Sequence, residues 1–144
     1  ALERFCAHFN YEPMLFEAKD SSGNLIYHTN VMMCLGSDYV LICDEMISDT
    51  DRRQEVITRL RASGRTVIKL SEQQINGFCG NALELHGKQG RFLAMSATSQ
   101  KLLNQLQLEQ IQSKLPIEFF NVSTIELAGG SIRCMLASIH LSQR

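Results

Sequence analysis

The sequence predicts an α/β protein built from repeated strand–strand–helix–strand units. Three observations predict this fold class. Runs rich in β-branched and aromatic residues alternate with helical patterns, glycine-containing turns separate neighbouring strands, and the same order of elements returns after about fifty residues. The chain has 144 residues, of which 44% are hydrophobic and 20% charged. This composition is typical of one globular domain.

Residues 1–29 read as the second half of a first, partial unit. Leu2, Phe5, Cys6 and Phe9 form one face of a helix over 2–9, and residues 14–16 read as a strand. A repeat fold buries its core between neighbouring units, so a chain that starts within a unit is expected to be part of a longer protein. We therefore interpret this chain as the C-terminal part of that protein.

A first complete unit spans about 30–80. Strands are expected at 31–35 and 39–43, joined by a tight turn at 36–38. Ser48, Asp49 or Thr50 can cap a helix over 51–63, which Gly64 ends. A third strand is expected at 66–70.

The same order returns in a second unit at about 81–131. Strands at 82–86 and 91–95 flank the turn at 87–90, and a helix over 97–114, with a break near Gln107, ends before Pro116. A strand at 117–121 closes the unit. A further strand at 132–140 would open a final hairpin over 132–144.

Composition excludes several classes of function. The net charge is −1 and the 14 Lys and Arg are scattered, which argues against nucleic-acid binding. No apolar run approaches the roughly 20 residues that a bilayer requires, and the first residues carry no signal-peptide pattern. Five Cys without a C-x-x-C spacing argue against a disulfide framework and favour a reduced, cytoplasmic compartment. The spacing of His and Cys predicts no metal site and no cofactor.

Two segments carry residues that are suited to catalysis. His28 and Asn30 precede the first strand of one unit. Two units later, the pair Gly129-Gly130 leads into the corresponding strand, which carries Cys134. Equivalent ends of repeated units point toward one centre in a ring, so His28 and Cys134 would face each other, as thiol catalysis requires. A structural interpretation remains open, in which Cys134 is a small buried apolar residue and His28 a hydrogen-bonded strand-edge residue. Cys6, Cys34, Cys43 and Cys79 are interpreted as packing residues.

These segments carry a family resemblance. The motifs His28-Thr29-Asn30, Gly80-Asn81 and the run from Gly129 to Met135 resemble the C-terminal half of the guanidino-group-modifying, or pentein, superfamily. That superfamily contains arginine deiminases, dimethylarginine hydrolases and amidinotransferases, and the nearest resemblance is to amidinotransferase-like citrulline-utilisation hydrolases. It implies an α/β-propeller of five units around a pseudo-fivefold axis, of which this chain covers roughly the C-terminal half of one catalytic domain. The other half would supply acidic site residues, so the fragment alone is expected to be inactive.

The resemblance also implies roles for single residues. Cys134 resembles the nucleophile and His28 the acid–base group, while Asn30, Gly130 and Ser131 would contact the substrate. Many arginine-acting members resemble His-x-Asp where this chain has Asn30. A neutral amide suits a neutral ureido group, so citrulline, converted to ornithine, ammonia and carbon dioxide, is the expected substrate.

Other functions remain open. They are hydrolysis of arginine or methylarginine, amidino transfer to an amine, and a non-catalytic α/β binding or assembly module. The expected partners are a small ureido or guanidino amino acid and the N-terminal half of the same protein, and the sequence leaves open a homo-oligomer. No nucleic-acid or membrane partner is expected.

Overall fold

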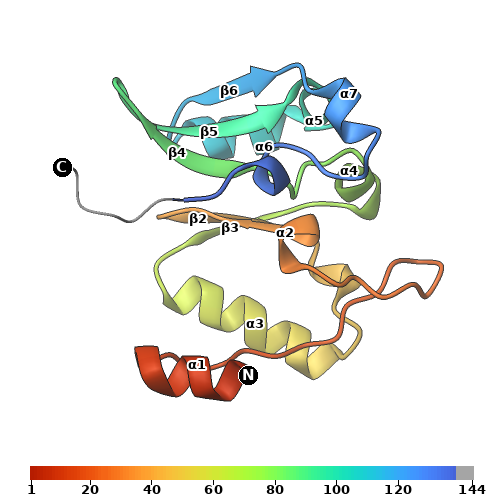
Figure 1. The fold of residues 1–144 in the computed structure, drawn as a ribbon, viewed down its shortest axis with the longest axis vertical. Helices are drawn as coiled ribbons and strands as arrows, with labels where there is room; N and C mark the ends of the chain where they lie inside the picture. Colours follow the sequence, from red (N-terminus) through yellow and green to blue (C-terminus); the bar gives the residue numbers. More distant parts are fainter. Residues whose placement is uncertain (139–144) are drawn as a thin grey trace.

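The computed structural model describes residues 1–138, whose strands form two separate three-stranded sheets (Figure 1). In each sheet the first two strands pair antiparallel as a hairpin, and the third returns parallel to the second after a helical connection. Both sheets therefore show the predicted order of strand, strand, helix, strand. The first sheet contains β1 (Met33–Leu35), β2 (Tyr39–Ile42) and β3 (Thr66–Lys69), and the second contains β4 (Leu83–Gly87), β5 (Gly90–Ser96) and β6 (Ile117–Phe120).

The helices begin at polar caps that are readable in the sequence. Asp49 accepts a hydrogen bond from the Arg52 amide and so caps the longest helix. Ser71 and Asn104 each form a capping box with a glutamine three residues later. The α-helices are α1 (Leu2–Phe9), α2 (Thr29–Met32), α3 (Thr50–Ala62), α4 (Glu72–Asn76), α5 (Ala97–Gln100), α6 (Gln105–Gln112) and α7 (Ser123–Glu126), and two 3-10 turns lie at η1 (Asp44–Met46) and η2 (Arg133–Met135).

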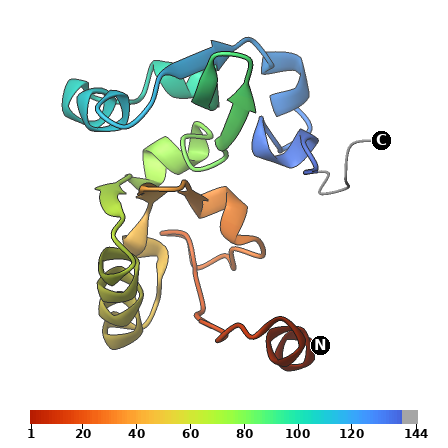
Figure 2. The same ribbon diagram turned by 90° about the vertical axis from the view of Figure 1, so that its left-hand side faces the viewer.

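One apolar core extends across both units. All four residues of β2 are buried, and Val56 and Ile57 of α3 pack into the same cluster as Leu93 and Met95 of β5. Figure 2 shows α3 beside the first sheet, and α5 and α6 beside the second. The two units are therefore packed against each other, as a repeat fold requires.

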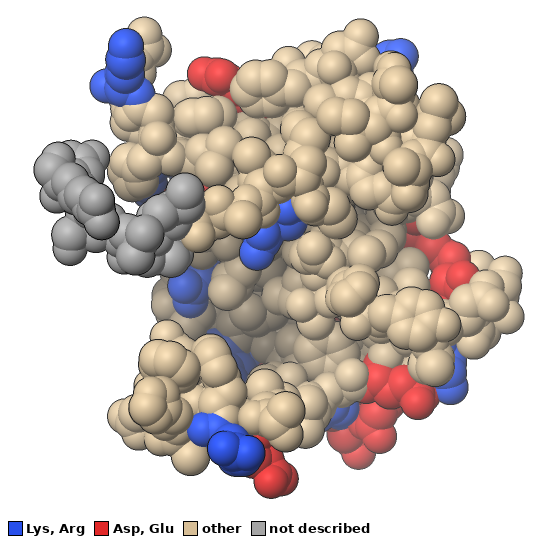
Figure 3. Space-filling view, viewed as in Figure 1, with Lys and Arg blue, Asp and Glu red and all other residues tan. Residues whose placement is uncertain are grey.

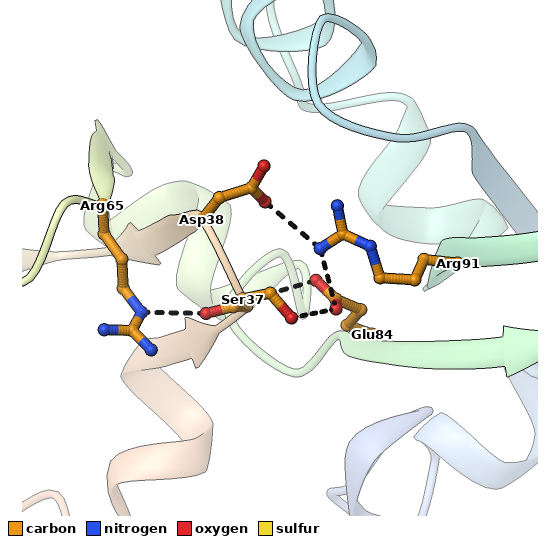
Figure 4. Close-up of polar contacts among 6 residues, drawn as sticks. Ser37, Asp38, Arg65, Glu84 and Arg91 are labelled. Atoms are coloured by element: carbon orange, nitrogen blue, oxygen red, sulfur yellow. Dashed lines mark hydrogen bonds and ion pairs between the residues drawn. The ribbon is translucent and has the colours of Figure 1, made fainter.

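A polar cluster, which we call the sheet junction, joins the two sheets at their ends (Figure 4). The amide and hydroxyl of Ser37 donate to the carboxylate of Glu84 over 3.1 and 2.6 Å. Arg91 Nη1 lies 3.4 Å from Asp38 Oδ1 and 3.3 Å from Glu84 Oε1, and Arg65 Nε donates to the Gly36 carbonyl over 2.9 Å. The turn between β1 and β2 is thus bound to β4 and β5, the two antiparallel strands of the second sheet.

Several sequence expectations about elements are wrong in detail. Residues 29–32 form helix α2, and the strand expected at 31–35 begins only at Met33. The Gly80 backbone packs closely against the Val31 carbonyl, and Asn81 Nδ2 donates to the Asn30 carbonyl, so tertiary contacts surround this helical turn.

The predicted helix over 97–114 is two helices. Its break lies at residues 101–104, earlier than Gln107, because Asn104 is extended and starts α6 with its own capping box. The short helices α4 and α7 were not anticipated, and residues 14–16 form no strand.

The strand expected at 132–140 is also wrong for its described part. Residues 133–135 form the turn η2, and no strand follows up to residue 138. The rest of the expected hairpin, at 139–144, lies outside the described residues.

The face of the molecule in Figure 3 is mostly uncharged. Lys and Arg side chains of the described residues are dispersed over it, and most of the Asp and Glu lie toward its lower right. No helix within residues 1–138 is long and apolar enough to cross a membrane.

Candidate active site

Cys134 is exposed, whereas the other four cysteines are buried. Burial raises the pKa of the Cys79 thiol to about 12. Burial, together with the nearby Glu84 carboxylate, likewise raises the pKa of Cys34 to about 12, although Arg133 opposes this shift. Buried thiols of this kind are protonated and inert. Cys134 is therefore the cysteine that a reagent or substrate can reach.

Two asparagines from distant parts of the chain meet at this thiol. Asn81 Nδ2 lies 3.0 Å from Cys134 Sγ and donates to the Asn30 carbonyl over 2.8 Å. Asn30 Nδ2 in turn lies 3.7 Å from the same sulfur. Asn30 belongs to α2, Asn81 lies two residues before β4, and Cys134 belongs to η2.

The convergence follows the repeat. Asn81 is 51 residues after Asn30, and Ser131 is 50 residues after Asn81. The three residues occupy equivalent positions near the starts of successive units. Asn81 Oδ1 accepts hydrogen bonds from the amides of Ser131 and Cys134 over 3.1 and 3.3 Å, so all three positions join in one network.

The glycine pair determines the space beside the thiol. Gly129 has φ of +89°, a conformation that glycine adopts without strain. A Cβ on Gly130 would lie 3.0 Å from Cys134 Cβ and 3.5 Å from its Sγ. Any side chain at Gly130 would therefore crowd the sulfur.

Ser131, predicted to bind substrate, is only 1% exposed. Its hydroxyl donates to Glu126 over 2.8 Å, and Glu126 also accepts from Thr98 over 2.6 Å. Burial acts to raise the pKa of Glu126, but hydrogen bonds from Thr98, Ser96 and Ser131 outweigh it and hold that pKa below its usual value. In this structure Ser131 links the glycine loop to α7, and its hydroxyl faces the protein interior.

His28 lies at the N-terminus of α2, two residues before Asn30, and is exposed. Its carbonyl accepts a hydrogen bond from the Val31 amide over 3.1 Å. The imidazole makes no hydrogen bond to another residue within 1–138. Within residues 1–138 the structure thus shows a hydrogen bond from Asn30 to Cys134 and none from the His28 imidazole, whose place relative to the thiol stays a prediction.

No individual role is assigned to Asn81 from the sequence, although its side chain is hydrogen-bonded to both Ser131 and Cys134. The signal was its position, because it follows Asn30 by one repeat and directly precedes an apolar strand. The glycine before it, Gly80, holds Asn81 close to α2, because a Cβ at Gly80 would lie 2.5 Å from the Val31 carbonyl oxygen. Within residues 1–138, His, Cys, Asp and Glu side chains form no group of three or more that could hold a metal ion.

Structure comparison identifies similar folds with low sequence identity. The product-bound N-terminal domain of ArgZ, an arginine dihydrolase from cyanobacteria, matches with a TM-score of 0.68 and 16% identity over 92% of this chain and 44% of that chain. A variant of the same domain, covalently bound to a reaction intermediate, matches equally, with a TM-score of 0.68, 16% identity and the same coverage. The apo structure of ArgZ matches with a TM-score of 0.66 and 16% identity over 91% of this chain and 19% of that chain. This chain therefore spans less than half the length of those proteins.

A family model gives the assignment that the structures alone do not give. No curated protein matches the chain significantly. The model for eukaryotic N,N dimethylarginine dimethylhydrolases, however, matches residues 1–141. Together with the ArgZ fold, this confirms the predicted resemblance to the guanidino-group-modifying superfamily, whereas the five-unit propeller stays a prediction. By a match that extends over nearly its whole length, the chain belongs to the N,N dimethylarginine dimethylhydrolase family.

Proposed function

We propose that this protein is a thiol-dependent hydrolase that cleaves a C–N bond of a ureido or guanidino amino acid, with citrulline as the preferred substrate. The observation that carries the proposal is the exposed thiol of Cys134 in contact with the side-chain amides of Asn30 and Asn81. Family membership supports the reaction class. The ArgZ domain with its covalently bound intermediate supports a covalent route.

In the proposed reaction, Cys134 is the nucleophile and His28 the acid–base group. The Cys134 thiolate forms a C–S bond to the central carbon of the substrate, and the C–N bond breaks as His28 protonates the departing amine. With citrulline, ammonia leaves, and the carbon stays bonded both to Cys134 Sγ and to the δ-nitrogen of ornithine as a substituted thiocarbamate. Water, deprotonated by His28, then attacks this carbon and displaces the thiolate. The resulting carbamate loses carbon dioxide and yields ornithine.

His28 must approach the thiol for these steps. It is exposed, and its imidazole has no hydrogen-bond partner within residues 1–138, so no existing bond must break before it turns toward a substrate. Catalytic hydrogen bonds commonly shorten only when substrate is bound.

Asn30 provides the argument for citrulline. Its Oδ1 is buried and has no hydrogen-bond partner within residues 1–138, while its Nδ2 faces Cys134. A buried acceptor without a donor costs free energy, and an NH₂ group of a bound substrate would supply that donor. The Asn30 amide carries no charge to stabilise a guanidinium. Gly130, without a side chain, leaves space for the reacting carbon.

Hydrolysis of arginine or a methylarginine is the second candidate. The family description and the ArgZ neighbours both favour a guanidino substrate. The same thiol chemistry serves both substrates, because each presents a planar carbon bonded to nitrogen. The choice depends on whether the site offers a charge to the substrate.

The test is turnover by the full-length protein. Citrulline, arginine and asymmetric dimethylarginine are incubated separately, and ammonia, ornithine, citrulline and dimethylamine are measured. Ornithine and ammonia from citrulline support the proposal, and activity confined to arginine or dimethylarginine establishes the second candidate. Protection of Cys134 from alkylation by citrulline supports binding at this thiol. Absence of both turnover and protection with all three compounds would leave a non-catalytic module as the function.

A further inference from the structure

We propose that Asn81 is a positioning residue that fixes the Cys134 turn and stabilises the thiolate through its side-chain amide. This inference rests on the proposed function, because it takes Cys134 as the nucleophile. Asn81 lies 53 residues before Cys134 in the chain and is only 4% exposed.

The orientation of the Asn81 amide follows from its partners. Its Oδ1 accepts from two backbone amides, those of Ser131 and Cys134, and backbone N–H groups can only donate. The opposite atom must therefore be the nitrogen. Nδ2 then donates one hydrogen to the Asn30 carbonyl over 2.8 Å and directs the other toward Cys134 Sγ at 3.0 Å.

This bonding pattern assigns Asn81 to the thiol and not to the substrate. An amide has two donor hydrogens and two acceptor lone pairs, and all four are engaged. Asn81 thus has no capacity left for a ligand. A hydrogen bond to an ionised partner is about twice as strong as one between neutral groups, so the N–H of Asn81 favours the thiolate over the thiol.

The backbone around Asn81 is held in place. A Cβ on Gly80 would lie 2.5 Å from the Val31 carbonyl oxygen, so α2 packs directly on the glycine. Phe78 has φ of +65°, and its carbonyl accepts the Asn81 amide over 2.9 Å in a tight turn. A donor fixed in this way needs no rearrangement when negative charge develops on the sulfur.

The substitution Asn81→Asp in the full-length protein tests the donor function of the Asn81 side chain apart from its acceptor function. The aspartate keeps an oxygen for the Ser131 and Cys134 amides, but it presents a second oxygen, instead of N–H, to the sulfur. We expect kcat to fall by about tenfold to a hundredfold, with KM changed by less than about threefold. The rate of Cys134 alkylation by iodoacetamide at fixed neutral pH should fall by a similar factor, and the other cysteines are buried.

Asn104→Asp is the matched control. It makes the same change of amide to carboxylate at the N-cap of α6, where an oxygen acceptor also serves the cap. Both readouts should stay within about twofold of the parent protein, as is usual for surface changes of less than about 0.5 kcal/mol. If Asn81→Asp does not fold, as judged by thermal unfolding, Asn81→Ala is expected to show the same loss of alkylation rate.

An unchanged alkylation rate in the folded Asn81 variant would overturn the inference, whatever the substrate results. Absence of turnover by the parent protein with every substrate would instead overturn the proposed function. In that case the alkylation comparison still decides whether Asn81 stabilises the thiolate. The two failures are therefore distinguishable.

Discussion

At the scale of single residues, cysteines differ in their environment with their depth in the fold. Cys79 is fully buried, and its thiol donates to the Ser99 carbonyl over 3.6 Å. Cys134 is exposed at a turn, and its sulfur lies 3.0 Å from Asn81 Nδ2. Burial thus distinguishes the packing residue Cys79 from Cys134, the proposed nucleophile, although both are preceded by apolar or glycine-rich sequence.

A pair of alanine substitutions tests this difference. Cys134→Ala should abolish turnover and leave the free energy of unfolding within about 0.5 kcal/mol of the parent value, as for most surface changes. Cys79→Ala should keep turnover and lower stability by about 1 kcal/mol, because it opens a small cavity in the core. Activity assays and urea unfolding of both variants measure these effects. Retained turnover in Cys134→Ala would eliminate the nucleophile assignment.

Asn30→Asp tests the choice between ureido and guanidino substrates. The substitution removes the Nδ2 donor and places a negative charge beside the substrate. A guanidinium gains a charge-assisted bond to that charge, whereas a neutral ureido group does not. We expect kcat/KM for citrulline to fall by at least about tenfold, and the preference to move toward arginine. The measurement is kcat/KM for both substrates in both proteins.

The ratio of the two substrates is the decisive quantity in that experiment. A carboxylate 3.7 Å from the sulfur, at the place of Asn30 Nδ2, also opposes thiolate formation, so both rates can fall together. An unchanged citrulline-to-arginine ratio would show that residue 30 does not touch the reacting group. The assignment of citrulline would then lose its support.

The repeat made part of the site predictable from sequence. Cys134 and Asn30 occupy equivalent ends of their units, and the structure brings them to 3.7 Å. Asn81 occupies the same position, but a sequence does not show which of several aligned polar residues turns inward. The place of His28 relative to the thiol stays a prediction, because an exposed side chain at a helix start is not fixed by packing.

At the scale of secondary-structure elements, two helices and most strands were predicted closely, whereas the helix over 97–114 and the shortest helices were not. The expected helices at 2–9 and 51–63 correspond to α1 and α3 within one residue at either end. Helices α2, α4 and α7 have only 4 or 5 residues, which is too short for a hydrophobic period to develop. Tertiary contacts, such as that of Gly80 with α2, decide these segments instead.

Gly80→Ala tests whether α2 holds Asn30 by close packing. The added Cβ would lie 2.5 Å from the Val31 carbonyl oxygen and 3.0 Å from the Met32 carbonyl carbon, so the helix must move. We expect a loss of stability of about 1–3 kcal/mol, as for other overpacked sites, and a decrease in kcat. Urea unfolding and steady-state kinetics measure both effects.

Gly64→Ala is the control for the cost of losing a glycine. Gly64 has φ of +83° after α3, and a Cβ there would meet nothing within 4 Å. Its replacement should cost about 1 kcal/mol through backbone strain alone and leave kcat unchanged. Equal kinetic effects of the two substitutions would contradict a specific role of the Gly80 contact.

At the scale of the whole molecule, two structurally similar units are held together by polar contacts as well as by the shared core. The sheet junction joins residues 47 and 53 positions apart. Buried amides of Gln74 and Gln107 form a second link, with a 2.6 Å hydrogen bond between the two units. The sequence shows these residues as ordinary polar positions, because nothing local indicates which distant partner each will meet.

Glu84 gives this junction a pH dependence. Burial acts to raise its pKa, but hydrogen bonds from Ser37 and the neighbouring Arg91 outweigh burial and hold the pKa below its ordinary value of 4.5. A carboxyl group whose pKa is lowered by folding stabilises the protein above its unfolded-state pKa. This contribution decreases as the pH falls through the lower, folded-state value.

Glu84→Gln should therefore lower the free energy of unfolding by about 1–3 kcal/mol at neutral pH, because a charge-assisted contact is lost inside the junction. The difference between the two proteins should shrink as the pH falls from 4.5 through the lower, folded-state pKa, at which the carboxylate of the folded parent protein becomes protonated. Urea unfolding of both proteins at several pH values measures it. Glu118→Gln is the control, because Glu118 is an exposed residue of β6 whose side chain makes no hydrogen bond within residues 1–138. A difference for Glu84→Gln that stays constant across this pH range would show that the side chain acts by packing, and that charge does not hold the two sheets together.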